Sequence, residues 1–108
     1  MNGRGSRDKG ARGERELAAI LREQLGVDAW RTPMSGAAFL PGDIAGVPGW
    51  HIEAKRCERW DLHAWIAQVE RGYELGDKPL VIFRSNREPW RVCLALADFL
   101  PLIRRSEV

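Results

Sequence analysis

Cysteine and histidine are scarce in this chain of 108 residues; each occurs only twice. Cys57 and Cys93 are not clustered and have no histidine at ligand spacing, which argues against a zinc site. We expect both to be reduced thiols. The fold must therefore depend on one hydrophobic core, and the length suits a single domain with little room for a second.

Long apolar runs are also absent. No stretch approaches the roughly 18 consecutive apolar residues of a membrane span, and the first residues lack the pattern of a signal peptide. The composition is 44% hydrophobic and 30% charged, which is typical of a globular protein rather than a disordered one. We expect a soluble cytoplasmic protein.

Lysine is rare too, since only Lys9, Lys55 and Lys78 are lysines among seventeen basic residues. Arginine suits bidentate phosphate contacts, although a compositional bias of the source genome would also produce this excess. The net charge is only +2, but residues 1–15 hold five basic side chains against two acidic ones. We expect residues 1–7 to form a flexible basic arm, which tracks a nucleic-acid backbone or is simply disordered, ahead of one domain over residues 8–108.

The middle of the chain carries a candidate metal site. Asp43 lies ten positions before Glu53-Ala54-Lys55, and residues 50–56 have the pattern of a strand, so Glu53 and Lys55 share one face. Two carboxylates offer the oxygen ligands that Mg²⁺ prefers, and Lys55 would orient a water or neutralise charge on a phosphate. The alternative is a solvated strand face with an exposed ion pair worth at most ~1 kcal/mol.

A helix is predicted from Asp8 to a stop at Gly26. Its buried face would consist of Leu17, Ala18, Leu21 and Leu25. Glu14 falls on this face, and because burying an unpaired carboxylate is costly, we interpret it as a further ligand of the metal or of a bound water. The alternative is a frayed position that reaches solvent. Glu16 and Glu23 have the pattern of ordinary exposed helix charges.

The remaining pattern predicts an α/β domain with a mixed central sheet and helices against it. Residues 27–32, 43–46 and 50–56 form an antiparallel meander, and Asp61 caps a helix whose apolar stripe extends to Tyr73. This helix crosses to a buried parallel strand at 80–84, followed by a strand at 90–95 and a helix at 98–105 interrupted by Pro101. Gln68 lies beside the apolar stripe, where it supports the site or faces water.

The loop between the first two strands is long enough to be functional. Ser35 and Gly36 are placed to approach a phosphate, with Arg31 nearby. Phe39 and Leu40 would wedge between bases, pack against a partner chain or join the core.

These residues together resemble the motifs of the PD-(D/E)XK nucleases, and within them most closely the archaeal-type Holliday junction resolvases and their phage relatives. The resemblance covers about residues 8 to 85 and rests on Glu14 within residues 10–17, on Arg31 with Ser35-Gly36, on Gly42-Asp43-Ile44 and on Glu53-Ala54-Lys55. It implies a restriction-endonuclease-like core with a five-stranded sheet. Mg²⁺ or Mn²⁺ would be held by Glu14, Asp43 and Glu53, with Lys55 assisting the attacking water and Ser35 near the scissile phosphate.

The resemblance also implies a homodimer that places two active sites on opposing strands of a four-way DNA junction for paired nicks, in the host cytoplasm if a phage encodes the chain. The expected DNA-binding residues are Arg4, Arg7, Lys9, Arg12, Arg31, Ser35, Gly36 and Arg56. The apolar carboxy-terminal half, including Trp90, Phe99 and Leu102, contributes either to the dimer or to the core.

Two departures from the family pattern are visible. Gly42 rather than proline precedes Asp43, and Ala54 stands where a β-branched residue is usual. Neither change removes a ligand. The same acids and lysine occur in repair nickases, restriction enzymes and exonucleases, so another nuclease of this superfamily is the first alternative. A non-catalytic DNA-binding module is the second, against which the intact set of four residues argues.

Overall fold

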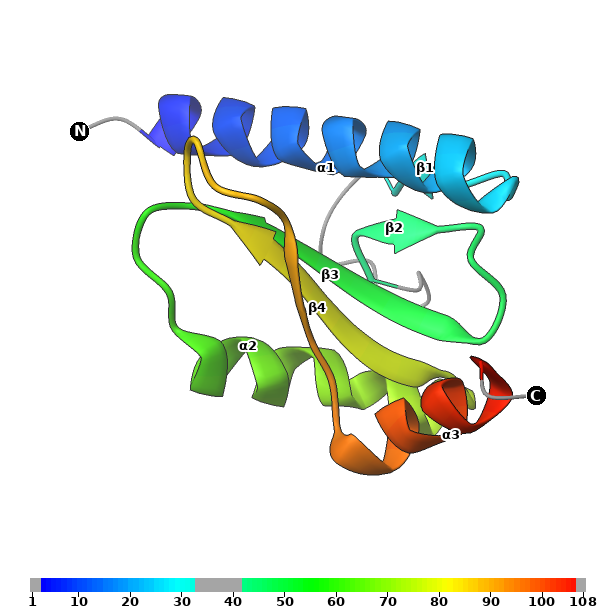
Figure 1. The fold of residues 1–108 in the computed structure, drawn as a ribbon. Coiled ribbons are helices and arrows are strands. Elements are labelled where there is room, and N and C mark those ends of the chain that lie inside the picture. The colour runs from blue at the N-terminus through cyan, green and yellow to red at the C-terminus, as the bar shows by residue number, and fades with distance from the viewer. Residues whose placement is uncertain (1–2, 33–41, 107–108) are drawn as a thin grey trace.

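The computed structural model describes residues 3–32 and 42–106, with side chains over residues 10–32 and 42–105. The expected α/β class with a mixed five-stranded sheet flanked by helices is confirmed (Figure 1). The elements are α1 (Gly3–Leu25), β1 (Trp30–Arg31), β2 (Ile44–Ala45), β3 (Trp50–Arg56), α2 (Leu62–Val69), the 3-10 helix η1 (Glu70–Leu75), β4 (Lys78–Arg84), β5 (Arg91–Cys93) and α3 (Leu96–Ser106).

The strands lie in the sheet in the order β1-β2-β3-β4-β5. The first three form the expected antiparallel meander, β3 and β4 are parallel and joined through α2 and η1, and β5 returns antiparallel to β4. In the parallel pair, Glu53 lies opposite Val81 and Lys55 opposite Phe83. Strand β3, which carries Glu53 and Lys55, is the third of the five strands and so lies at the centre of the sheet.

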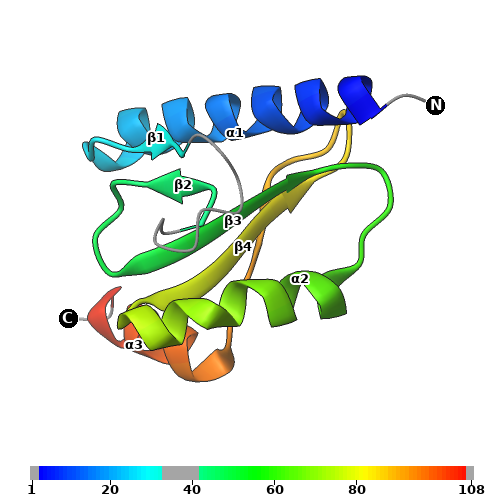
Figure 2. The same ribbon diagram turned by 180° about the vertical axis from the view of Figure 1, so that it is seen from behind.

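The helices cover opposite faces of the sheet, as Figures 1 and 2 show for α1 and α2. On the α1 face, Leu17 and Ala18 pack with Ile52, Ala54 and Ile82. On the other face, the core residues are Trp65, Val69, Val81 and Phe83. Because side chains alternate along a strand, Ile52 and Ala54 of β3 face α1, whereas Glu53 and Lys55 face the α2 side.

Helix α1 begins at Gly3 rather than Asp8, so residues 3–7 are helical and not the flexible arm that their composition predicts. Extending an existing helix adds one hydrogen bond per residue without a new nucleation step, which offsets the poor propensity of the glycines. At the other end, Gly26 stops the helix with φ 67°, as expected. Leu25 is 55% exposed, so its assignment to the buried face is wrong.

The second helix has the predicted cap, since Asp61 accepts a hydrogen bond from the Ala64 amide at 3.2 Å. Beyond Val69 the chain continues as the 3-10 helix η1 and ends at Gly76, which has φ 81°. A 3-10 helix turns 120° per residue instead of 100°, so the apolar stripe shifts. Tyr73, expected on the buried stripe, is accordingly exposed.

The carboxy-terminal segment differs from the prediction in two ways. Helix α3 begins at Leu96 and continues through Pro101, which does not interrupt it. Trp90 packs against the α1-side core, whereas Phe99 and Leu102 are exposed. The core interpretation is therefore correct for Trp90 and wrong for the other two. Among the helices that the structure describes, none combines the length and apolar character needed to span a membrane.

Candidate active site

Strand β3 carries the buried carboxyl of the candidate site. Glu53 is 5% exposed, and Lys55, two residues on, is half-buried on the same face. Next to them, His51 is fully buried, with Nε2 at 3.8 Å from Oε1 of Glu53. A Cβ on Gly72 of η1 would clash with the His51 side chain, so this glycine allows the helical crossover to approach β3 closely.

Asp43 is fixed between two strands. Its amide donates to the Ile52 carbonyl at 2.8 Å, its carbonyl accepts from the Thr32 amide at 2.9 Å, and its carboxylate Oδ2 accepts from the Ala54 amide at 2.9 Å. Gly42 before it has φ 71°, and a Cβ there would clash with the Ile52 carbonyl. Proline, whose φ is fixed near −65°, cannot occupy this position, which explains the departure from the family pattern.

The carboxyl of Glu53 lies close enough to that of Asp43 to donate a hydrogen bond to it when protonated. Burial, this hydrogen bond of the protonated form and the charge of Asp43 together raise the pKa of Glu53 from its ordinary 4.5 to about 8. Oε2 of Glu53 is buried and has no hydrogen-bond partner in the described part of the chain. Two adjacent carboxyls share one proton at neutral pH, and both ionise cheaply only when a cation lies beside them. The pair therefore has the chemistry of a cation site.

Glu14 joins this pair from α1. It lies in the interior of the helix with its side chain 16% exposed, which removes the alternative of a frayed position in solvent. Burial and the nearby charge of Asp43 raise the pKa of Glu14, and Arg31 opposes both effects by donating from Nε to Oε1 at 2.6 Å. The structure thus brings Arg31, an expected DNA contact, into an ion pair beside the carboxylates.

Lys55 also has a defined position. Its Nζ donates to Oε1 of Gln68 on α2 at 3.1 Å. This contact favours the interpretation in which Gln68 supports the site over the one in which it only faces water.

The ligand set suits a hard divalent ion, although it is not a closed cage. Within residues 10–32 and 42–105, no three His, Cys, Asp or Glu side chains are arranged as a complete metal site. Mg²⁺ is usually bound through one or two carboxylates and completes its shell with water and substrate oxygens. The Asp43 and Glu53 pair, with the unpaired Oε2 and with Glu14 beside Asp43, fits that requirement.

Several expected site residues lie outside the described residues. Ser35 and Gly36, and the apolar Phe39 and Leu40, fall in residues 33–41. The basic residues Arg4, Arg7 and Lys9 have helical backbone in α1, but their side chains are outside the described ones.

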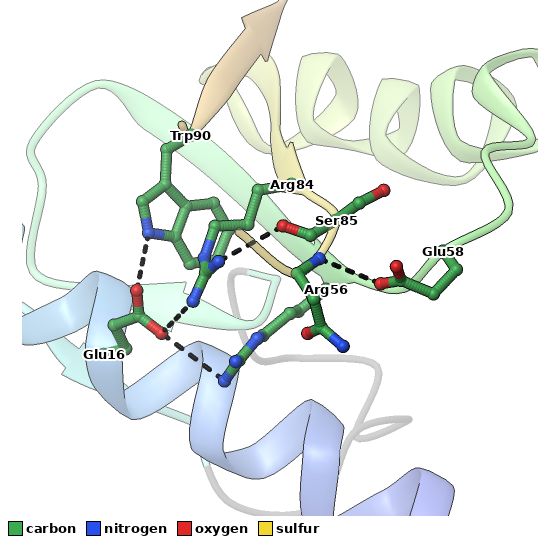
Figure 3. A network of polar contacts seen from close by, with 7 residues as sticks. Glu16, Arg56, Glu58, Arg84, Ser85 and Trp90 are labelled. Atoms are coloured by element: carbon green, nitrogen blue, oxygen red, sulfur yellow. Dashed lines mark hydrogen bonds and ion pairs between the residues drawn. The ribbon is translucent and has the colours of Figure 1, made fainter. Parts of the chain in front are cut away.

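Glu16 is not the ordinary exposed charge that the pattern predicts. Figure 3 shows it between Arg56, Arg84 and Trp90. Its carboxylate accepts from Arg84 at 3.0 Å and from Trp90 Nε1 at 3.1 Å, and lies 3.5 Å from Arg56. Burial alone would raise the pKa of Glu16, but the hydrogen bonds from Arg84 and Trp90 outweigh it and lower the pKa. These partners are 68 and 74 residues away in the chain, so no local signal separates Glu16 from Glu23.

The alternation of β3 predicts that His51 shares a face with Glu53 and Lys55, but it does not predict that His51 is completely buried. Burial and the charge of Arg71 lower its pKa, so the imidazole is neutral near pH 7. The alternation of β3 indicates the direction of this side chain, but its complete burial depends on the close approach of Gly72.

Comparisons with known proteins agree with this geometry. The family model described as "Phage putative PDDEXK endonuclease" matches residues 5–107. Protein D14 of Escherichia phage T5 is 33% identical over 116 aligned positions, which cover 86% of this chain and 72% of that protein. The structure of Hjc, a Holliday junction resolvase from the archaeal hyperthermophile Archaeoglobus fulgidus, matches with a TM-score of 0.59 at 25% identity, over 79% of this chain and 76% of Hjc. The chain therefore belongs to the PD-(D/E)XK nucleases, in the family of phage PDDEXK endonucleases.

Proposed function

We propose that the protein is a metal-dependent, structure-selective endonuclease that resolves four-way (Holliday) DNA junctions by paired symmetric nicks. The observation that carries the proposal is the carboxyl pair of half-buried Asp43 and buried Glu53, with Lys55 on the same face of β3 as Glu53. The choice of junctions over linear DNA is supported by the similarity to Hjc, which is described as a Holliday junction resolvase. The nuclease domain would comprise residues 8–108 and act in the cytoplasm, that of the host if a phage encodes it.

The carboxylates would hold a divalent cation, with Mg²⁺ preferred and Mn²⁺ as a substitute. Asp43 and Glu53 offer adjacent oxygens, and Glu14 adds a third carboxylate beside Asp43. When bound, such an ion polarises the phosphoryl oxygens and lowers the pKa of a coordinated water. The hydrogen bond from the Ala54 amide orients the Asp43 carboxylate for this role.

Lys55 would orient the attacking water or neutralise the charge that develops on the phosphate. The hydrogen bond to Gln68 restricts its long side chain, so Gln68 acts as a positioning residue. We place Ser35 near the scissile phosphate. Arg31 donates from Nε to Glu14, and its other guanidinium donors would contact DNA. The remaining proposed DNA contacts are Arg4, Arg7, Lys9, Arg12, Gly36 and Arg56.

Cleavage of end-labelled, immobile four-way junctions tests the proposal, against linear duplex of matching sequence and with Mg²⁺ or EDTA. We expect paired symmetric nicks on the junction only, and only with metal. Asp43→Asn should lower the cleavage rate by more than about 100-fold, because even residues outside the ligand shell commonly cost 10–100-fold. Glu23→Gln, which removes an exposed charge from the same helix as Glu14, should cleave at the wild-type rate.

Each other outcome excludes part of the proposal. Metal-dependent cutting by Asp43→Asn at the wild-type rate would show that the site is wrongly assigned. Equal cutting of linear duplex would retain the nuclease and remove the junction selectivity. Binding without any cutting would favour a DNA-binding module.

Another DNA nuclease of the superfamily, of repair or restriction type, is the second candidate. The observation in its favour is that the matching family description names an endonuclease without naming a substrate. The comparison of junction with duplex separates the two candidates directly.

A further inference from the structure

An open hollow lies beside the amino-terminal half of α1, where the turn between β4 and β5 reaches this helix (Figure 1). Its lining is almost entirely cationic and consists of Arg12, Arg56, Arg84, Asn86 and Arg87. The two acidic residues in the surrounding network are Glu16, which contacts Arg56 and Arg84, and Glu58, which accepts from the Asn86 amide (Figure 3). Four guanidinium groups against two carboxylates leave an excess of positive charge.

Two of these arginines are held in fixed orientations. The Arg84 guanidinium donates to Glu16 and to the Ser85 carbonyl and lies 5.4 Å from the centre of the Trp90 ring. Arg56 lies against Glu16 at 3.5 Å. Nε of both arginines is nevertheless buried without a hydrogen-bond partner in the described residues. A phosphate in the hollow would therefore be bound by the outer nitrogens of these guanidinium groups, whose planar geometry matches phosphate oxygens.

The turn itself supports a binding role. Arg87 has φ 62°, the only positive φ of a non-glycine residue in the described part of the chain, and its side chain is exposed. A non-glycine residue in this region costs about 1 kcal/mol or more, and such strain tends to occur at functional sites. The strained turn presents a guanidinium group at the edge of the hollow.

We propose that this arginine hollow binds the phosphodiester backbone of the DNA substrate at phosphates away from the scissile one. Glu14 contacts Arg31 of β1, whereas Glu16 contacts Arg84 of β4 and Trp90, which directly precedes β5. Strand β1 forms one edge of the sheet and β5 the other. The carboxylate site and the hollow therefore lie on opposite flanks of α1, and DNA that touches both extends across this helix. Arg84, Asn86 and Arg87 become DNA contacts in addition to Arg12 and Arg56. This inference rests on the proposed nuclease function for its substrate.

Binding measurements on the full-length protein test the hollow. The probes are labelled four-way junction and linear duplex of matching sequence, measured by fluorescence anisotropy in EDTA at several salt concentrations. The double variant Arg12→Ala, Arg87→Asn removes the two exposed guanidinium groups, and asparagine tolerates the positive φ at position 87. We expect affinity to fall by about 10-fold or more. The slope of log K against log salt should become shallower by about 0.9 for each phosphate that the variant no longer neutralises.

The matched control is Arg104→Ala, Arg105→Ala, which removes the same charge from the exposed last turn of α3. This control should bind within about 2-fold of wild type and keep the wild-type salt slope, since its arginines lie outside the hollow. Hydroxyl-radical footprints of the Arg12, Arg87 variant should lose protection away from the nick and keep protection around it. Affinity and salt slope equal to those of the control would overturn the proposal.

The failure of the hollow and the failure of the nuclease are distinguishable. If wild-type protein cuts DNA but the Arg12, Arg87 variant binds like the control, the hollow is wrong and the nuclease remains. If wild-type protein never cuts, but binds DNA and loses affinity in this variant, the hollow stands and the nuclease is wrong. Melting temperatures of both double variants near that of wild type would exclude misfolding as the cause of weakened binding.

Discussion

At the scale of single residues, the site is built by backbone constraints as much as by the acids themselves. Asp43 is held through its amide, its carbonyl and its carboxylate, and Gly42 has a conformation that proline cannot adopt. The glycine is therefore a requirement of the close approach to Ile52 and not a loss of the family motif. Asp43 can lie beside Glu53 because Gly42, the residue before it, has no side chain that would clash with the Ile52 carbonyl.

The raised pKa of Glu53 predicts a pH-dependent destabilisation of the metal-free protein. A carboxyl whose pKa is raised on folding costs nothing below its unfolded pKa near 4.5, and its cost grows with pH until it is complete above about 8. In EDTA, Glu53→Gln should therefore melt at the wild-type temperature near pH 4.5. Near pH 8.5 it should melt higher, by about 4–8 °C for each ~1 kcal/mol of penalty removed.

Thermal unfolding across this pH range checks the prediction, with Glu23→Gln as the control for the loss of one negative charge at an exposed position. A Glu53→Gln variant that is no more stable than wild type at high pH would show that burial and Asp43 do not penalise the ionised carboxyl.

At the scale of elements, periodicity predicts what depends on local pattern and misses what depends on tertiary contact. Strand β3 has the predicted bounds because its alternation is regular over residues 50–56, and Asp61 caps α2 as its residue type suggests. The prediction for Tyr73 is wrong because the helix tightens into the 3-10 helix η1. No residue pattern in the sequence indicates this change from α-helix to 3-10 helix.

The acid and lysine motif could be found from the sequence because three of its members lie within thirteen positions, from Asp43 to Lys55. The Glu16 network could not, because it joins α1 to β3, to β4 and to the segment before β5. Contacts over such separations are products of topology, and one sequence by itself carries no signal for them.

The Glu16 network predicts a defined contribution to stability. Glu16→Ala would leave the Arg84 guanidinium and the Trp90 N–H without their acceptor in a partly buried place, at a cost of about 1–3 kcal/mol. Glu23→Ala, on the same helix but exposed, should change stability by no more than about 0.5 kcal/mol. Urea unfolding measures both, and equal stabilities of the two variants would mean that the network contributes nothing.

At the scale of the whole molecule, apolar side chains remain exposed at one end of the fold. They belong to β5 and α3 and include Val92, Leu96, Phe99, Leu100 and Ile103. Figure 1 shows α3 at the opposite end of the molecule from the amino terminus of α1. Val92, Leu96 and Phe99 line one open hollow together. Contiguous apolar surface of this kind usually marks a protein interface, which makes it the candidate surface for the homodimer that the family resemblance implies.

The dimer predicts a specific effect of one exposed leucine. Leu96 is 68% exposed, so Leu96→Glu should not affect folding but should place a desolvated charge in the interface. We expect wild type to sediment as a dimer at micromolar concentration and Leu96→Glu as a monomer, whereas Leu25→Glu, at an exposed leucine on α1, should remain dimeric. The monomer should nick single strands of a junction without pairing the nicks, because one active site cannot reach both strands. A monomeric wild type, or a dimeric Leu96→Glu variant, would exclude this surface as the interface and require the paired nicks to arise in another way.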